Sequence, residues 1–192
     1  MRRFLLAALA LLPLAAAAAC DDAANPFDEV TIVTDSTLVL RAPTAGVESA
    51  SALDASTRPP FSRPRTVRPE LPEFAGEWDF ALRQNGSTFS FVTQRGVVLG
   101  ASRSSFPLIA RSNTAFDAID EAERSRATYS DSSIVLAEGA AYTYRTRAYA
   151  VSGGTCFNYG KLRVLRLDPA TGTARLEAAV NPRCDDVRLV PD

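Results

Sequence analysis

The chain contains no histidine, and Lys161 is the only lysine among its 192 residues. Without histidine it cannot build a Ser-His-Asp triad, a Cys-His pair, a histidine-ligated zinc site or a histidine-based pH switch. A Ser-x-x-Lys motif is also excluded, because Asn158 stands three residues before Lys161. Glycine-rich phosphate-binding loops are missing as well. We therefore expect no cofactor, no metal centre and no histidine-dependent catalysis.

Cysteine is scarce too, and its three positions are Cys20, Cys156 and Cys184. An odd number of cysteines in an exported chain leaves one of them outside any intramolecular pair. If Cys20 is that residue, Cys156 and Cys184 remain as one pair, which an oxidising compartment joins. We predict this disulfide, since two thiols without histidine cannot fill the four positions of a zinc site.

The first 20 residues, MRRFLLAALALLPLAAAAAC, are ordered like an export signal. Arg2 and Arg3 are followed by an apolar run over residues 4–14 and by small residues over 15–19. This layout is typical of a secretory signal peptide, and the run is too short for a spanning helix. We predict that residues 1–19 are removed. The remaining 173 residues carry a net charge of −3, because the removed segment holds two arginines and no acidic residue, and this charge argues against nucleic-acid binding.

Two cleavage products fit the small residues before Cys20. Ala17 and Ala19 form an ordinary A-x-A site, which leaves Cys20 as a free N-terminal residue. Alternatively, the AAAC tetrapeptide resembles the box of bacterial lipoproteins, although Ala17 stands where those proteins most often have leucine. The resemblance implies a diacylglycerol group on the Cys20 thiol, and more than one acyl chain makes membrane anchoring stable. We then expect export across the inner membrane and anchoring to the inner or outer membrane, on the periplasmic side.

Residues 20–76 are predicted to form an N-terminal tether. Within it, residues 29–41 are rich in β-branched side chains and favour one long strand, or two strands broken at Asp35-Ser36. Residues 58–72 contain five prolines and four arginines, a composition that stays extended and cannot join the interior of a sheet. We interpret this run as a surface connector, with a PxxP ligand at residues 69–72 as the alternative.

The predicted core domain, residues 77–192, opens with a hairpin. Trp78, Phe80 and Leu82 alternate with polar or small residues, as in a half-buried strand, and the Asn85-Gly86 pair predicts a tight turn. Folding about that turn pairs Leu82 with Phe89 and Phe80 with Phe91. A third strand is predicted at residues 96–101.

The middle of this domain is predicted to hold a helix and a second hairpin. Residues 114–126 have a Thr114/Asp117 capping-box spacing, early acidic residues and late arginines, which favour a helix. Residues 132–137 and 140–151 read as paired strands around Glu138-Gly139. Tyrosines and arginines interleave over 142–149, which we interpret as alternating strand faces rather than as a platform for bases or sugars.

The last hairpin links the strand pattern to the cysteines. Residues 162–167 and 173–180 flank the turn-forming segment 168–172. A turn centred on Ala170 pairs Leu162 with Ala178, and the same register brings Cys156 opposite Cys184. The adjacent apolar residues at 164–165 break the alternation, so we expect a bulge there.

Several short segments resemble a family of bacterial lipoproteins to which no activity is attached. They are WDFALR at 78–83, FDAI at 116–119, RTR at 145–147, YGKL at 159–162 after Cys156, and NPRC at 181–184. The resemblance implies the same envelope localisation and an intact domain. It identifies no ligand.

The fold expected from these patterns is mainly β, as a single antiparallel β-sandwich or partly open barrel with one short helix. The expected function is a lipid-anchored envelope protein with a binding or structural role, with the membrane and an envelope protein as partners. One alternative is a carboxylate-dependent hydrolase that uses either Glu77 and Asp79 or the acidic residues of the predicted helix. Glu77 and Asp79 are, however, both predicted on the solvent face of one strand. The other is a carrier of a small apolar ligand, if the β domain is hollow. No catalytic residue is assigned.

Overall fold

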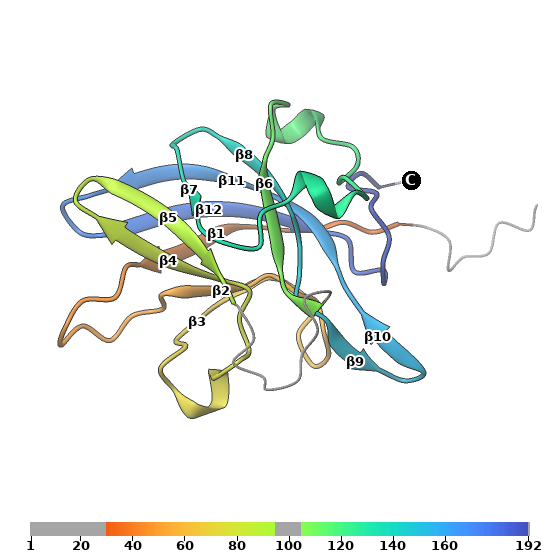
Figure 1. The fold of residues 1–192 in the computed structure, drawn as a ribbon, viewed down its shortest axis with the longest axis horizontal. Coiled ribbons are helices and arrows are strands. Elements are labelled where there is room, and N and C mark those ends of the chain that lie inside the picture. Colours follow the sequence, from red (N-terminus) through yellow and green to blue (C-terminus); the bar gives the residue numbers. More distant parts are fainter. Residues whose placement is uncertain (1–29, 95–104, 192) are drawn as a thin grey trace, which may run out of the picture.

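A computed structural model describes residues 30–94 and 105–191, and these form two antiparallel sheets that face each other (Figure 1). One sheet has the order β1 (Val33–Arg41), β12 (Thr173–Val180), β11 (Tyr159–Asp168), β8 (Ala141–Arg145) and β6 (Leu108–Arg111). The other has the order β3 (Arg65–Val67), β2 (Ala52–Asp54), β4 (Phe80–Asn85), β5 (Thr88–Thr93) and β7 (Ile134–Val135). A small hairpin, β9 (Tyr149–Val151) and β10 (Gly154–Cys156), extends from the first sheet. The predicted mainly β class is confirmed, and the arrangement is sandwich-like rather than a closed barrel.

The space between the sheets is filled by aromatic and aliphatic side chains from both. Phe80 contacts Phe91 in its own sheet and the edge of Tyr144 in the other, each with 5.8 Å between ring centroids. Gly160 of β11 lies directly beneath Tyr144, where a Cβ atom would approach the ring Cζ to 2.2 Å. Because the ring occupies the space of a side chain at 160, glycine is the only residue that fits this strand position.

The segment predicted as a tether contributes strands to both sheets. β1 pairs with β12, with an irregularity between Asp35 and Leu38 at the place where a break was expected. β2 pairs with β3 and β4. β3 lies within the proline-rich run but at the edge of its sheet, the position that such a run tolerates. From Val33 onward, therefore, this segment belongs to the folded sheets rather than to a tether.

The predicted hairpin of β4 and β5 is present, but its register is shifted by two residues. Leu82 pairs with Phe91 instead of Phe89, and the turn residues are Gly86 and Ser87 instead of Asn85 and Gly86. Gly86 has a φ of +60° and Ser87 does not have a positive φ, as in a type II′ turn, which needs glycine only at its first central position. A shift of two keeps every side chain on its predicted face, so Phe80, Leu82, Phe89 and Phe91 still point into the core.

The predicted pairing of residues 132–137 with 140–151 is wrong. β7 pairs with β5 in one sheet, whereas β8 pairs with β6 and β11 in the other. The turn at Glu138-Gly139 therefore crosses between the sheets instead of closing a hairpin. Two apolar strands joined by a short turn can either pair with each other or join two different sheets. The alternation of apolar and polar residues is the same in both cases, so the sequence does not distinguish them. The strand predicted at residues 96–101 lies outside the described residues.

The predicted helix over 114–126 is also wrong, because this segment forms only a 3-10 turn at Phe116–Ala118 and a second one at Arg126–Thr128. The backbone between them instead pairs with the C-terminal segment, where Ala122 N donates to Val187 O at 2.8 Å and Leu189 N to Asp120 O at 2.7 Å. Phe116, Ile119 and Ala122 are buried against Val187 and Leu189. Tertiary pairing thus outweighs a weak helical preference. Within the described residues, no helix has the length and apolar character needed to cross a membrane.

The last hairpin matches its prediction. Leu162 pairs with Ala178 and Arg163 with Glu177, and the register shifts between Val164 and Arg166 at the expected bulge. Cys156 and Cys184 form a disulfide with 5.1 Å between their Cα atoms. The predicted disulfide is therefore present, and it joins β10 to the segment after β12.

Candidate functional site

A buried ionic network lies at the end of the sandwich where β2, the residue before β4 and the residues after β8 meet. Asp79 is 0 % exposed and Asp54 is 1 % exposed, and Arg147 lies between them. Nη1 of Arg147 is 3.1 Å from a carboxylate oxygen of each aspartate. The two acids therefore share one guanidinium nitrogen away from water.

Backbone groups complete the coordination of Asp79. The N–H of Arg147 donates to Asp79 Oδ1 at 2.7 Å, and the N–H of Ala55 donates to Asp79 Oδ2 at 2.8 Å. Since Arg147 lies just beyond β8 and Ala55 just beyond β2, Asp79 holds the ends of strands from the two sheets together. A buried carboxylate with two backbone donors and an ion pair meets the condition for stable burial of charge.

Asp54 is held from the opposite side as well. Arg65 donates to Asp54 Oδ2 through Nε at 3.1 Å and through Nη2 at 3.0 Å, and Ser56 Oγ donates to Oδ1 at 2.7 Å. The guanidinium of Arg65 in turn lies 3.4 Å from the centroid of the Phe61 ring, a cation–π contact. Within the described part of the chain, Asp54 thus has two cationic partners and Asp79 has one.

The two aspartates differ in their acidity for this reason. Burial acts to raise the pKa of Asp79, and although the Arg147 charge opposes this, the nearby Asp54 charge adds to the rise, so that the pKa lies above its usual value. Burial also acts on Asp54, but the Arg147 charge and the hydrogen bonds from Ser56, Arg147 and Arg65 outweigh it and lower the pKa. Asp79 is therefore the member of the pair that takes up a proton first.

A cavity of about 390 Å³ lies over this network on the side of Arg147. We call it the arginine cavity, and its wall is made by Arg58, Gly76, Glu77, Gln94, Ser105, Phe106, Pro107, Arg147, Ala148, Tyr149, Ala150 and Thr155. The β9–β10 hairpin supplies one side, and the segments before β3 and β4 supply another. Cys156 is the residue after Thr155, so the disulfide staples this side of the cavity to the C-terminal segment.

Three buried nitrogen donors on this wall have no hydrogen-bond partner among the described residues. They are Nη2 of Arg147, Nε of Arg58 and Nε2 of Gln94. Gln94 is only 5 % exposed and Arg147 only 8 % exposed. An unsatisfied buried donor costs about 1–3 kcal/mol, and most such groups in folded proteins have a protein or water partner. All three donors belong to residues that line one cavity, and this marks it as the candidate site.

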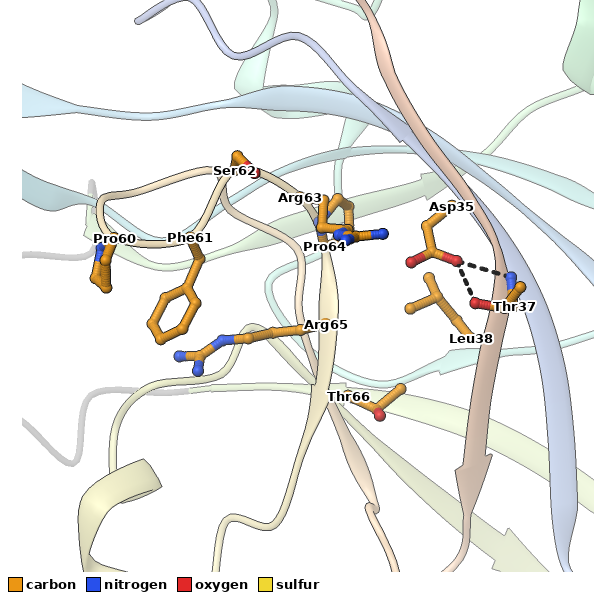
Figure 2. A pocket seen from close by; sticks show the side chains of 10 residues that line it. All are labelled: Asp35, Thr37, Leu38, Pro60, Phe61, Ser62, Arg63, Pro64, Arg65 and Thr66. Carbon is orange, nitrogen blue, oxygen red and sulfur yellow. Dashed lines mark hydrogen bonds between the residues drawn. The ribbon is translucent and has the colours of Figure 1, made fainter.

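Two other hollows lack this feature. The first, of about 420 Å³, lies between β1 and the residues leading into β3, and Figure 2 shows its lining side chains. There Asp35 accepts hydrogen bonds from the N–H and hydroxyl of Thr37, and Arg65 is already bound to Asp54. The second, of about 750 Å³, lies beside Trp78. The described residues lining either hollow contribute no buried polar atom without a partner.

The structure places some of the residues singled out from the sequence differently from their prediction. Cys20 and the signal peptide lie outside the described residues. Asp79 was predicted on the solvent face with Glu77, and this is wrong: Asp79 is buried, because the strand begins at Phe80 and the residue before it turns inward to the Ala55 and Arg147 N–H groups. Trp78 likewise leaves the face of Phe80 and packs beside Ala81.

Asp54 and Arg58 went unrecognised in the sequence. Asp54 ends a strand of only three residues, too short to show alternation. Arg58 begins the proline-rich run over 58–72, whose composition predicts a surface connector. The interleaved arginines at 145–147 were the one signal that pointed toward this region, and of these Arg147 is the residue at the network.

Within residues 30–94 and 105–191, no three histidine, cysteine, aspartate or glutamate side chains gather closely enough to hold a metal ion. The donors left unsatisfied at the arginine cavity are nitrogens that carry hydrogen, which repel a cation and attract an anion or a neutral acceptor.

Comparison of the chain with protein-family models, with curated proteins and with solved structures returned no match. The resemblance to bacterial lipoproteins therefore stays a prediction from the sequence. The candidate site rests on the geometry of the described residues alone.

Proposed function

We propose that the protein is a lipid-anchored protein of the bacterial cell envelope that binds a small ligand in the arginine cavity. The observation that carries the binding role is the set of three buried donors without a hydrogen-bond acceptor on residues that line this cavity. A ligand that accepts hydrogen bonds from them removes the cost of leaving them unpaired. Ligand sites of this kind combine a few convergent polar groups with apolar walls, as Arg147 and Gln94 do here with Phe106 and Pro107.

The anchor is proposed at Cys20, after removal of residues 1–19. The Cys156–Cys184 disulfide supports an oxidising compartment such as the periplasm. The chain from Cys20 to Val30 is ten peptide units long, and a fully extended chain of that length spans at most about 35 Å. Val30 is buried in the fold, so the acyl chains hold the domain close to the membrane surface.

The alternatives in which the β domain is a hydrolase or an apolar carrier receive less support. Both carboxylate oxygens of Asp79 accept backbone hydrogen bonds and the side chain has no exposed surface, which disfavours a catalytic carboxylate pair with Glu77. The interior between the sheets is occupied by packed rings such as Phe80, Phe91 and Tyr144, which disfavours a hollow carrier. An envelope protein as a further partner stays a prediction from the sequence.

The binding role is tested by filling the cavity. Ala150 lines the arginine cavity and is exposed, and its neighbour Val151 is exposed but does not line it. Adjacent residues of a strand point to opposite faces, so Ala150→Phe and Val151→Phe add the same ring to opposite sides of β9. Native mass spectrometry of protein purified from its own membranes should show a bound small molecule in the wild type and in Val151→Phe, and its loss in Ala150→Phe. Equal occupancy of all three proteins contradicts binding in this cavity.

The anchor is tested separately with Cys20→Ala. We expect the wild-type protein to partition into the detergent phase after membrane extraction and the variant to stay in the aqueous phase. Aqueous partitioning of both proteins excludes lipidation without bearing on the cavity.

A further inference from the structure

Glu77 already presents a carboxylate to the arginines of the cavity. Its Oε2 contacts Nη2 of Arg58 and lies 3.9 Å from Nη2 of Arg147. The longer distance leaves a charge attraction without a hydrogen bond. The Glu77 side chain is 31 % exposed, and it lies in the segment between η1 (Pro72–Phe74) and β4, outside any strand. A carboxylate therefore fits between the two guanidinium groups, and the one that is there can move into solvent.

The groups left unsatisfied at the cavity are all donors. Nη1 of Arg147, a residue of the cavity wall, is used by the two buried aspartates, while Nη2 of the same guanidinium is buried without a hydrogen bond and lies 3.9 Å from Glu77 Oε2. Nε of Arg58 and Nε2 of Gln94 add an N–H each. A carboxylate has two oxygens and accepts only, and it pairs with guanidinium groups through strong, planar, charge-assisted hydrogen bonds.

The charge of the cluster sets the charge of the ligand. Among the described residues, three guanidinium groups are balanced by three carboxylates, those of Arg58, Arg65 and Arg147 by those of Asp54, Glu77 and Asp79. Moving Glu77 into water leaves one positive charge in excess at the cavity. A ligand with a single negative charge restores the balance, whereas a phosphate brings nearly two charges to a site partly walled by buried acids.

The remainder of the cavity is suited to an apolar body. Phe106 and Pro107 line it, and Tyr149 adds an aromatic ring whose hydroxyl is already bound to Asn158 Oδ1 at 2.8 Å. Aromatic rings pack favourably against such walls.

We infer, on the basis of the proposed binding function, that the ligand is a small carboxylic acid in its anionic form. Its carboxylate replaces that of Glu77 on Arg58 and Arg147 and also accepts from Gln94, and its apolar body lies against Phe106 and Tyr149. Glu77 is thus a resident competitor that keeps the two arginines paired when the cavity holds no ligand. The site should select ligands first by their negative charge and second by the fit of their apolar part to these side chains.

The probe pair is benzoate and benzamide, which have the same shape and differ in charge. Isothermal titration of the mature chain should show benzoate binding and benzamide binding at least about tenfold more weakly, because hydrogen bonds to charged groups contribute about 1.5–3 kcal/mol. Glu77→Gln removes the competitor and should raise benzoate affinity about tenfold, and Arg58→Gln should lower it by about tenfold or more. Glu73→Gln, an exposed acid outside the cavity wall, is the matched control and should leave the affinity unchanged.

The inference is overturned if benzamide binds as well as benzoate, if no benzoate binds at millimolar concentration, or if Glu77→Gln does not raise the affinity. Inorganic phosphate that displaces benzoate and binds more tightly overturns the assignment of a carboxylate. Circular dichroism of Arg58→Gln separates lost binding from lost folding, and the gain expected of Glu77→Gln cannot arise from unfolding. If Ala150→Phe loses a co-purified molecule but the wild type does not prefer benzoate to benzamide, the proposed binding function stands. Only the inference that the ligand is a carboxylate is then overturned.

Discussion

Arg147→Leu is the substitution that perturbs the ionic network most, because it leaves two buried aspartates with less compensation. Asp79 loses the one cationic partner that it has among the described residues, whose Nη1 is 3.1 Å from Oδ2. At that distance the attraction of two unit charges is about 5 kcal/mol for an effective dielectric constant of about 20, and breaking a buried pair costs about 3–5 kcal/mol in practice. Asp79 keeps two backbone donors and Asp54 keeps Arg65, so we expect a loss near the lower limit, about 3 kcal/mol.

The loss depends on pH in a direction set by Asp79. Burial raises the folded-state pKa of Asp79, so the folded protein binds its proton more readily than the unfolded chain does. Stability from this group is therefore greatest below its unfolded pKa and falls as the pH rises through the folded pKa. Removing the Arg147 charge raises the folded pKa further. The destabilisation by Arg147→Leu should consequently be larger at about pH 8 than at about pH 5.

Urea denaturation with the disulfide intact, followed by tryptophan fluorescence, measures both quantities. Arg166→Leu, at an exposed position of β11, is the control and should change the free energy of unfolding by less than about 0.5 kcal/mol. The double variant Arg147→Leu/Asp79→Asn should recover part of the loss, because it removes the uncompensated charge. A loss below about 1 kcal/mol, or a loss equal at the two pH values, refutes the reasoning.

Two further predictions concern the packing of the sheets and the disulfide. Gly160→Ala places a Cβ atom 2.2 Å from the Tyr144 ring and 2.6 Å from the carbonyl of Ala179. It should therefore lower the free energy of unfolding, measured by thermal unfolding, by about 3 kcal/mol or more. A loss within experimental error contradicts the placement of Tyr144. Replacing Cys156 and Cys184 together by alanine opens a loop with a sequence separation of 28. On the chain-entropy model this should lower the free energy of unfolding by about 3.5 kcal/mol. An unchanged urea midpoint contradicts a stabilising role of the disulfide.

Local patterns predicted the β-rich fold well where strand neighbours are also chain neighbours. The last hairpin followed from the pairing of Leu162 with Ala178 and of Arg163 with Glu177, and the same register placed Cys156 opposite Cys184. The first hairpin was predicted with the right faces and a register two residues away, because Asn85-Gly86 and Gly86-Ser87 both form tight turns.

Patterns failed where a distant segment decided the structure. Residues 119–122 lack a helix because the backbone pairs with residues 187–189, which no local preference reveals. β7 and β8 separate into different sheets for the same reason: each has a better partner far along the chain.

The candidate site was the part least accessible to sequence. Asp54, Asp79 and Arg147 come from three distant positions, and a charged residue in a short or irregular segment is most often a solvated one. Only the fold shows that these charges are buried together and that Arg58, Gln94 and Arg147, each with a buried unsatisfied donor, line one cavity.

The most direct test of the whole account is native mass spectrometry of the protein released from its own membranes in mild detergent. We predict the mass of residues 20–192 with acyl chains attached, and on activation the release of a small carboxylic acid from the folded protein. An unlipidated chain that carries no bound molecule, or only a neutral one, would contradict it.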